Sequence, residues 1–157
     1  MGLQEVRWSQ SGETAVGNYH LLWSGPPEGQ PRFGGVALAL NPAAYSALKS
    51  WFPVSNRLLV AKLQHRFGTL SVVVAYALTN EASDDDKDDF YAFLEQAMQL
   101  VNTNDLVLCF GDLMRSLGQL EILPMSWALM ALALTNNYQR LRDFCIGANL
   151  RICGSWF

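Results

Sequence analysis

Two strand-forming runs around a short polar segment constrain the fold of this chain more than any other feature. The runs cover residues 56–63 and 69–77, are rich in Leu, Val and Ala, and flank His65-Arg66-Phe67-Gly68. Such a pair of runs on either side of a short glycine-containing segment predicts a β-hairpin. A further buried strand is predicted at residues 36–40, where an apolar run stops at Asn41-Pro42. We therefore expect a sheet with buried central strands.

Helical patterns dominate the second half of the chain. Ser83-Asp84-Asp85-Asp86 is a strong helix start, because serine caps the first turn and the acids complement the helix dipole. Apolar side chains then recur at helical spacing up to residue 101, and a second amphipathic helix is predicted at residues 139–150. Further strands are predicted at residues 2–6, 19–23, 106–110 and 151–153. Antiparallel-style strands followed by strand–helix–strand–helix–strand indicate an α/β sandwich with a mixed sheet.

The size and charge of the chain limit its partners. A length of 157 residues supports one domain, and a net charge of −3 provides no overall attraction to nucleic acid. Residues 1–80 carry six Lys or Arg against three Glu, whereas residues 81–157 carry five Lys or Arg against eleven acids. A DNA-facing surface would therefore be local and drawn from the first half, the alternative being ordinary scatter of surface charge. Its basic side chains would be Arg7, Arg32, Lys49, Arg57, Lys62 and Arg66.

The cysteines and the apolar runs predict an intracellular protein of the nucleus or cytoplasm that is not secreted. The three cysteines form no CxxC pair, and an odd number suits a reducing compartment better than a disulfide framework. No signal peptide is visible at the start. The longest apolar run, residues 125–134, has about half of the ~20 residues that a membrane span needs. This run has three possible interpretations: a segment packed in the core, a helix that binds a partner, or a loop of apolar character.

Three places put polar side chains just past an apolar strand, where sites tend to form in α/β sheets. They are Leu3-Gln4-Glu5, the stretch from Ala75 to Thr79, and Cys109-Phe110-Gly111-Asp112. Two carboxylates from separate strands suit a hard cation such as Mg²⁺, and a nearby tyrosine can hydrogen-bond a phosphate oxygen. The alternative is that Asp112 caps the next segment and Glu5 is merely solvated, and spacing does not decide between them.

The same places also match known motifs. Gly2-Leu3-Gln4-Glu5-Val6-Arg7-Trp8, Tyr76-Ala77-Leu78-Thr79 and Gly111-Asp112-Leu113-Met114 occur in the order of three motifs of the endonuclease/exonuclease/phosphatase family. Residues 136–145 look like a fourth segment, specific to retrotransposon-encoded members. The match covers nearly the whole chain except about residues 119–134. The chain thus resembles the AP-endonuclease-like domain of non-LTR retrotransposons, in the branch that includes craniofacial development protein 2-like proteins.

This resemblance implies a fold, an activity and a set of site residues. The fold would be a partial four-layer α/β sandwich with mixed, mainly antiparallel sheets. Residues 1–157 would form a single incomplete domain that lacks an N-terminal strand and the C-terminal part. The activity would be that of a metal-dependent phosphodiester hydrolase, of endonuclease type and retrotransposon origin, using Mg²⁺ or Mn²⁺.

By the same resemblance, each motif residue has a role. Glu5 and Asp112 would bind the metal, Asp112 would also orient or activate the attacking water, and Tyr76 would contact the phosphate. Three further side chains would contact nucleic acid, DNA in preference to RNA, and no obligate protein partner is inferred. They are Arg7, Arg57 and Asn136.

Several departures from the family pattern lead us to expect weak or no activity. Met114 stands where the family has an asparagine, Leu78 where a proline is usual, and Tyr138 where these relatives have a glycine. A thioether cannot donate to a phosphate oxygen as an amide does. The family's final aspartate–histidine pair, which supplies the general base, is absent from the sequence. The alternatives are a catalytically silent nuclease remnant, or an interaction module whose acidic patch at residues 81–89 binds a basic partner.

Overall fold

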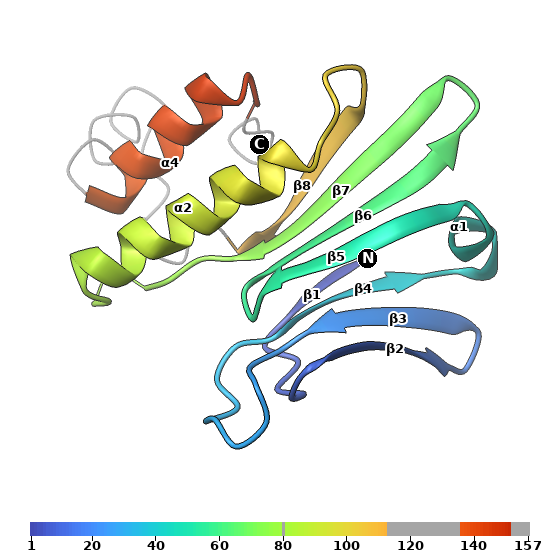
Figure 1. The fold of residues 1–157 in the computed structure, drawn as a ribbon, viewed down its shortest axis with the longest axis horizontal. Coiled ribbons are helices and arrows are strands. Elements are labelled where there is room, and N and C mark those ends of the chain that lie inside the picture. Colours follow the sequence, from blue (N-terminus) through green and yellow to red (C-terminus); the bar gives the residue numbers. More distant parts are fainter. Residues whose placement is uncertain (80, 113–135, 152–157) are drawn as a thin grey trace, which may run out of the picture.

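The computed structural model describes residues 1–79, 81–112 and 136–151, with side chains in the last segment from residue 139 onward. The described part consists of two four-stranded sheets, with helices on one side of the second sheet (Figure 1). This arrangement confirms the predicted α/β sandwich with mixed, mainly antiparallel sheets.

The first sheet is antiparallel throughout and has the order β1-β4-β3-β2. Its strands are β1 (Gly2–Gln4), β2 (Ser11–Val16), β3 (Tyr19–Ser24) and β4 (Val36–Leu40). The apolar run that predicted β4 is buried at every position. The edge strand β2 was not predicted, because its side chains are almost all exposed and show no apolar alternation.

The second sheet has the order β5-β6-β7-β8. Its strands are β5 (Leu48–Ser55), β6 (Leu58–His65), β7 (Gly68–Tyr76) and β8 (Leu106–Asp112). The predicted hairpin is confirmed, and His65 pairs with Gly68 where it closes. β8 runs parallel to β7, and helix α2 makes the crossover between them.

The helices are α1 (Pro42–Ser46), α2 (Asp84–Gln99) and α4 (Asn136–Gly147). Ser83 caps α2 as predicted, its side chain accepting a hydrogen bond from the Asp86 amide. Helix α4 begins and ends a few residues earlier than the predicted 139–150. Asn41-Pro42 was predicted only to stop β4, but Asn41 caps α1 and Pro42 occupies its first turn.

The two faces of β7 enter two different cores. One face packs between the sheets, where Val72, Val74 and Tyr76 meet Leu22 and Leu38 of the first sheet. The other face packs under α2, where Val73, Ala75 and Ala77 meet buried side chains of that helix, namely Phe90, Leu94 and Ala97. Tyr76 is therefore directed into the space between the sheets, at the end of its strand.

Several predictions fall on residues that the structure does not describe. Met114, the apolar run at residues 125–134, and residues 152 and 153 of the last predicted strand lie outside the described ranges. Of the helices that are described, none is long and apolar enough to cross a membrane.

Candidate functional site

Strand pairing brings two of the predicted site residues together. In the parallel pair β7–β8, Tyr76 is the register partner of Asp112, so their side chains lie on the same face of the sheet. The Ala77 amide donates to the Asp112 carbonyl at 3.1 Å and extends the pairing past the end of β7. Gly111 permits this approach, because a Cβ at that position would collide with the carbonyl oxygen of Ala75. The motif glycine therefore has a packing role beside the aspartate.

The third predicted residue reaches the same place from the other sheet. Glu5 directly follows β1, and the Tyr76 hydroxyl donates to Glu5 Oε1 at 2.7 Å, although 71 positions separate the two residues. Arg7 Nη2 lies 3.5 Å from Glu5 Oε2, so both carboxylate oxygens have a partner. The Glu5 side chain is nevertheless 39% exposed. This carboxylate is held in place and remains open to solvent.

The backbone that carries Glu5 is strained. Glu5 and Arg7 have φ angles of 56° and 57°, in the left-handed region that side chains other than glycine seldom adopt. Neighbouring glycines hold this turn, because Val6 N donates to Gly35 O and Arg7 N to Gly34 O, both at 3.1 Å. Such conformations persist only where the surroundings enforce them, and they cluster at functional sites.

Arg57, predicted as a nucleic-acid contact, lies behind Tyr76. Its guanidinium carbon is 4.9 Å from the centre of the Tyr76 ring, and Nη1 donates to the carbonyls of Tyr76 and Ala77 at 3.3 and 3.4 Å. Burial lowers the pKa of Arg57 below its usual value, while the charges of Tyr76 and Asp86 raise it in part. The contact with Tyr76 was not foreseen, since nothing in the local sequence links the two residues.

The structure thus brings most of the predicted site residues to the end of β7. Glu5 accepts a hydrogen bond from Tyr76, Asp112 is the register partner of Tyr76, and Arg7 and Arg57 lie beside Glu5 and Tyr76 respectively. Asn136 begins α4, and its side chain lies outside the described part. The supporting glycines Gly34 and Gly35 were not predicted as part of the site, although two successive glycines also indicate a required positive φ.

The donors at this site suit a hard divalent cation. Glu5 and Asp112 offer carboxylate oxygens, and Mg²⁺ is commonly held by one or two carboxylates with water and substrate phosphate completing its shell. Within the described residues, no three His, Cys, Asp or Glu side chains gather closely enough to hold a metal. Among the described residues, the carboxylates that such a metal site could use are therefore these two.

Both histidines of the sequence lie away from the site. The ring of His20 stacks on that of Tyr45, with centroids 3.6 Å apart. His20 pairs with Leu40 at one end of β4, whereas the strand that leads to Glu5 pairs with Val36 at the other end. His65 closes the β6–β7 hairpin, and β7 separates it from Tyr76 by roughly 25 Å of extended chain. Neither imidazole can act on a group bound between Glu5 and Asp112.

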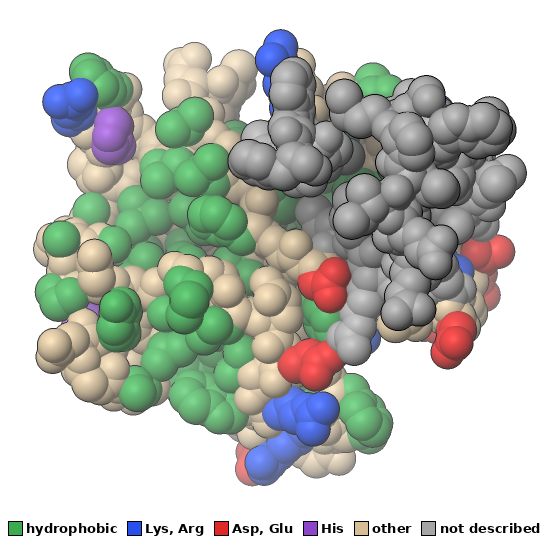
Figure 2. All heavy atoms as spheres, turned by 180° about the vertical axis from the view of Figure 1, so that it is seen from behind, with side chains coloured by type: hydrophobic (Ala, Val, Ile, Leu, Met, Phe, Trp, Pro, Cys, Tyr) green, Lys and Arg blue, Asp and Glu red, His purple; other side chains and the backbone are tan. Residues whose placement is uncertain are grey.

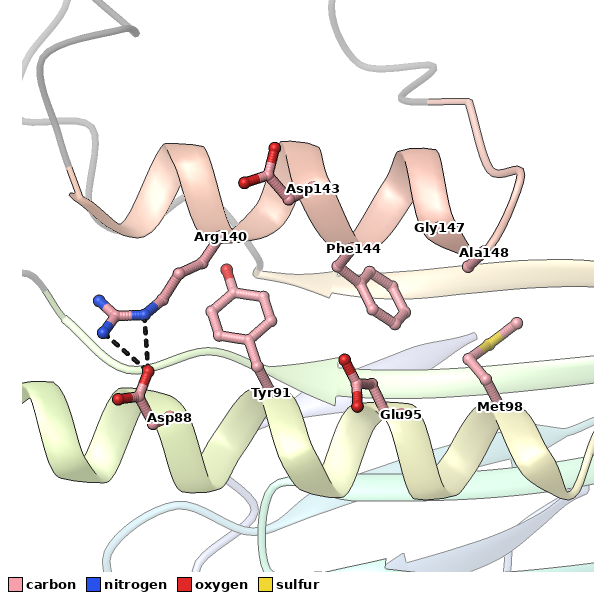
Figure 3. Close-up of a pocket in the computed structure, with 9 residues that line it drawn as sticks. All are labelled: Asp88, Tyr91, Glu95, Met98, Arg140, Asp143, Phe144, Gly147 and Ala148. Atoms are coloured by element: carbon pink, nitrogen blue, oxygen red, sulfur yellow. Dashed lines mark hydrogen bonds and ion pairs between the residues drawn. The ribbon is translucent and has the colours of Figure 1, made fainter.

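A separate pocket of about 530 Å³ lies between α2 and α4 (Figure 3). Arg140 of α4 pairs there with Asp88 at 2.7 Å and with Asp84 at 3.3 Å, so the acidic start of α2 is bound within the chain. Burial raises the pKa of Tyr91 to about 12. Because α2 covers the opposite face of the second sheet from Tyr76, this pocket is distinct from the Glu5–Tyr76 site.

Comparison with known proteins gives a distant relationship. No family model matches this chain. The chain is similar over its whole length to craniofacial development protein 2 from Tragulus javanicus and from Bos taurus, with 25% identity to each. It spans about a quarter of the length of these curated relatives, 27% of the first and 26% of the second. The expected relation to craniofacial development protein 2, a family related to the endonuclease/exonuclease/phosphatase proteins, is confirmed at this distant level.

Proposed function

We propose that this chain is a nuclease-like domain of retrotransposon origin that binds a divalent cation and a nucleic-acid phosphate between Glu5, Tyr76 and Asp112. The observation that carries the proposal is the hydrogen bond from Tyr76 to Glu5 at 2.7 Å, with Asp112 in register beside Tyr76. These three residues come from three motifs of the resemblance, and two different sheets bring them to one place. A chance match of motifs gives no reason for such convergence.

Each residue has a distinct role in this proposal. The carboxylates of Glu5 and Asp112 hold Mg²⁺ or Mn²⁺, which would polarise a phosphoryl oxygen of the substrate. Tyr76 has one hydroxyl hydrogen, and in this structure the hydroxyl uses it in a hydrogen bond to Glu5. When a phosphate is bound, the hydroxyl exchanges Glu5 for a phosphate oxygen. Arg7 contributes a positive charge at the rim, its side chain being 70% exposed.

Hydrolysis by this chain is proposed to be weak. Neither histidine reaches the site, so an imidazole base is lacking, and a positioned base contributes ~10²–10⁴-fold to such reactions. Asp112 can orient a water molecule at this site. We therefore expect binding to be easier to detect than cleavage, and DNA is the proposed substrate.

The test is thermal unfolding of the purified chain with and without millimolar Mg²⁺ or Mn²⁺. A ligand that binds only the folded state raises the midpoint. At ten times the dissociation constant, we expect an increase of about 3–6 °C for a chain of this size. Asp112→Ala and Glu5→Gln should abolish the increase. Glu13→Gln is the matched control, since Glu13 is an exposed carboxylate on β2, and it should keep the full increase.

A second assay separates binding from catalysis. Supercoiled plasmid is incubated with the wild-type chain and with Asp112→Ala in Mg²⁺. Slow nicking that disappears in Asp112→Ala would show residual activity. If the metal raises the unfolding midpoint but no nicking occurs, the chain is a domain that binds metal without catalysis. No metal response in the wild-type chain would refute the site and leave the silent nuclease remnant.

A further inference from the structure

Arg57 makes an unusual set of contacts for a basic side chain. It lies in the turn between β5 and β6, and its guanidinium packs over the face of Tyr76 at 4.9 Å while donating to the carbonyls of Tyr76 and Ala77. Its own carbonyl accepts a hydrogen bond from the Tyr76 amide at 2.9 Å. One residue therefore contacts the ring and both backbone groups of Tyr76.

The charge of Arg57 is half-buried, and no ion pair with another described residue balances it. Among the described residues, no Asp or Glu lies within ion-pair distance of its guanidinium, and Asp86 acts on it only from farther away. Arg140, by contrast, pairs directly with Asp84 and Asp88. A half-buried charge without an ion-pair partner is costly for folding, and the contacts of this guanidinium with described residues all fall on Tyr76 and Ala77, beside the site.

We infer that Arg57 is the positioning residue of the site, holding the Tyr76 ring and hydroxyl in place and providing positive charge for a bound phosphate. The planar guanidinium fixes the plane of the ring, which directs the hydroxyl toward Glu5. This role rests on the proposed function, because it concerns the same site. The sequence predicted only that Arg57 contacts nucleic acid directly. The inference adds that Arg57 acts through Tyr76, by holding its ring in place.

The position of the Tyr76 ring is measured by NMR of protein labelled with ¹³C at the tyrosine Cζ atom. The chain has only five tyrosines, and the signal that is lost in Tyr76→Phe identifies Tyr76. Arg57→Met keeps an unbranched side chain and removes the planar cation. We expect it to displace the Tyr76 signal, because the ring loses its support and the bond to Glu5 changes. Arg57→Lys retains the charge but not the plane, and should displace the signal as well.

The chain provides a matched control for the loss of an arginine from an aromatic ring. Arg66 lies 4.3 Å from the centre of the Phe67 ring on the exposed β6–β7 hairpin. Arg66→Met removes the same kind of contact and the same charge, far from Tyr76. It should leave the Tyr76 signal at the wild-type position. If Arg57→Met fails to melt cooperatively, Arg57→Lys carries the test.

Titration with inorganic phosphate in the presence of Mg²⁺ tests whether the position of the Tyr76 ring affects phosphate binding. We expect Arg57→Met to weaken phosphate binding about five-fold, with Arg66→Met unchanged. An unmoved Tyr76 signal in both Arg57 variants would overturn the inference, whatever the wild-type chain binds. A displaced signal together with a wild-type chain that binds neither Mg²⁺ nor phosphate would refute the proposed function instead, while Arg57 would still position Tyr76.

Discussion

Strand β7 has a hydrogen-bonded carboxylate near each of its ends. Near its start, Asp105 accepts hydrogen bonds from Ser71 Oγ at 2.7 Å and from the Asn102 amide at 3.1 Å, with Lys62 Nζ 3.9 Å away. At its other end, Glu5 accepts one from Tyr76. We call these the Asp105 cluster, which comprises Lys62, Ser71, Asn102 and Asp105, and the Glu5 cluster, which comprises Glu5, Arg7, Tyr76 and Asp112.

The two clusters differ in access to solvent and in backbone geometry. The Asp105 side chain is 5% exposed, whereas that of Glu5 is 39% exposed. Hydrogen bonds from Ser71 and Asn102, with the charge of Lys62, lower the pKa of Asp105 despite its burial. The left-handed backbone at Glu5 adds strain that the Asp105 cluster lacks. The comparison contrasts a buried carboxylate that holds the fold with an exposed one that we propose binds a ligand.

The two clusters also use different faces of the second sheet. Leu106, Leu108 and Phe110 of β8 lie on the same face as Tyr76 and are 63%, 40% and 42% exposed. Seen from behind the view of Figure 1, the molecule carries hydrophobic side chains over a broad area of its surface (Figure 2). Tyr76 of the Glu5 cluster therefore lies on an incompletely covered sheet face, whereas Ser71 of the Asp105 cluster lies on the opposite face and is fully buried.

The largest expected effect is at Gly111, which sets the distance between β7 and β8 at the Glu5 cluster. Gly111→Ala would place a Cβ against the carbonyl of Ala75, so the strands must separate. We expect a loss of about 3 kcal/mol in the free energy of unfolding, measured by urea denaturation. Gly147→Ala is the control, since a Cβ there meets nothing within 4 Å. Equal stability of Gly111→Ala and wild type would show that the pairing of Tyr76 with Asp112 does not occur.

The next effect distinguishes the two carboxylates directly. Asp105→Asn removes the charge of the buried carboxylate in the Asp105 cluster and is expected to cost about 2 kcal/mol of unfolding free energy. Glu5→Gln makes the same chemical change at the exposed cluster and should cost less than about 1 kcal/mol. Urea denaturation at pH 7 measures the change in unfolding free energy for both variants. A larger loss for Glu5→Gln would reverse the assignment of structural and ligand-binding carboxylates.

The smallest effect concerns acid stability. Because the folded state lowers the pKa of Asp105 below its ordinary 3.8, its contribution is present above that pH and is lost as the pH falls through the lower, folded value. The stability of Asp105→Asn should therefore change less with pH than that of the wild type below about pH 4. Unfolding midpoints measured from pH 2 to pH 7 provide the comparison. Parallel curves for the two proteins would contradict the charge-based role of Asp105.

Local patterns were sufficient for much of the fold. The apolar run of β4, the hairpin closed by His65 and Gly68, and the Ser83 cap of α2 were all predicted from the residues themselves. Each depends on neighbours in the sequence, such as the capping of an amide three residues away. Strand β5, by contrast, contains Pro53 and register shifts, and it was not predicted because pairing with β6 determines it.

The site shows the same division more sharply. Motif order in the sequence was enough to name Glu5, Tyr76 and Asp112 as candidates, because each follows an apolar strand within a recognisable motif. Only the tertiary structure decided that Tyr76 bonds Glu5 and that Arg57 lies behind its ring. These contacts join residues 71 and 19 positions apart, and such distances are closed by sheet packing rather than by any local preference.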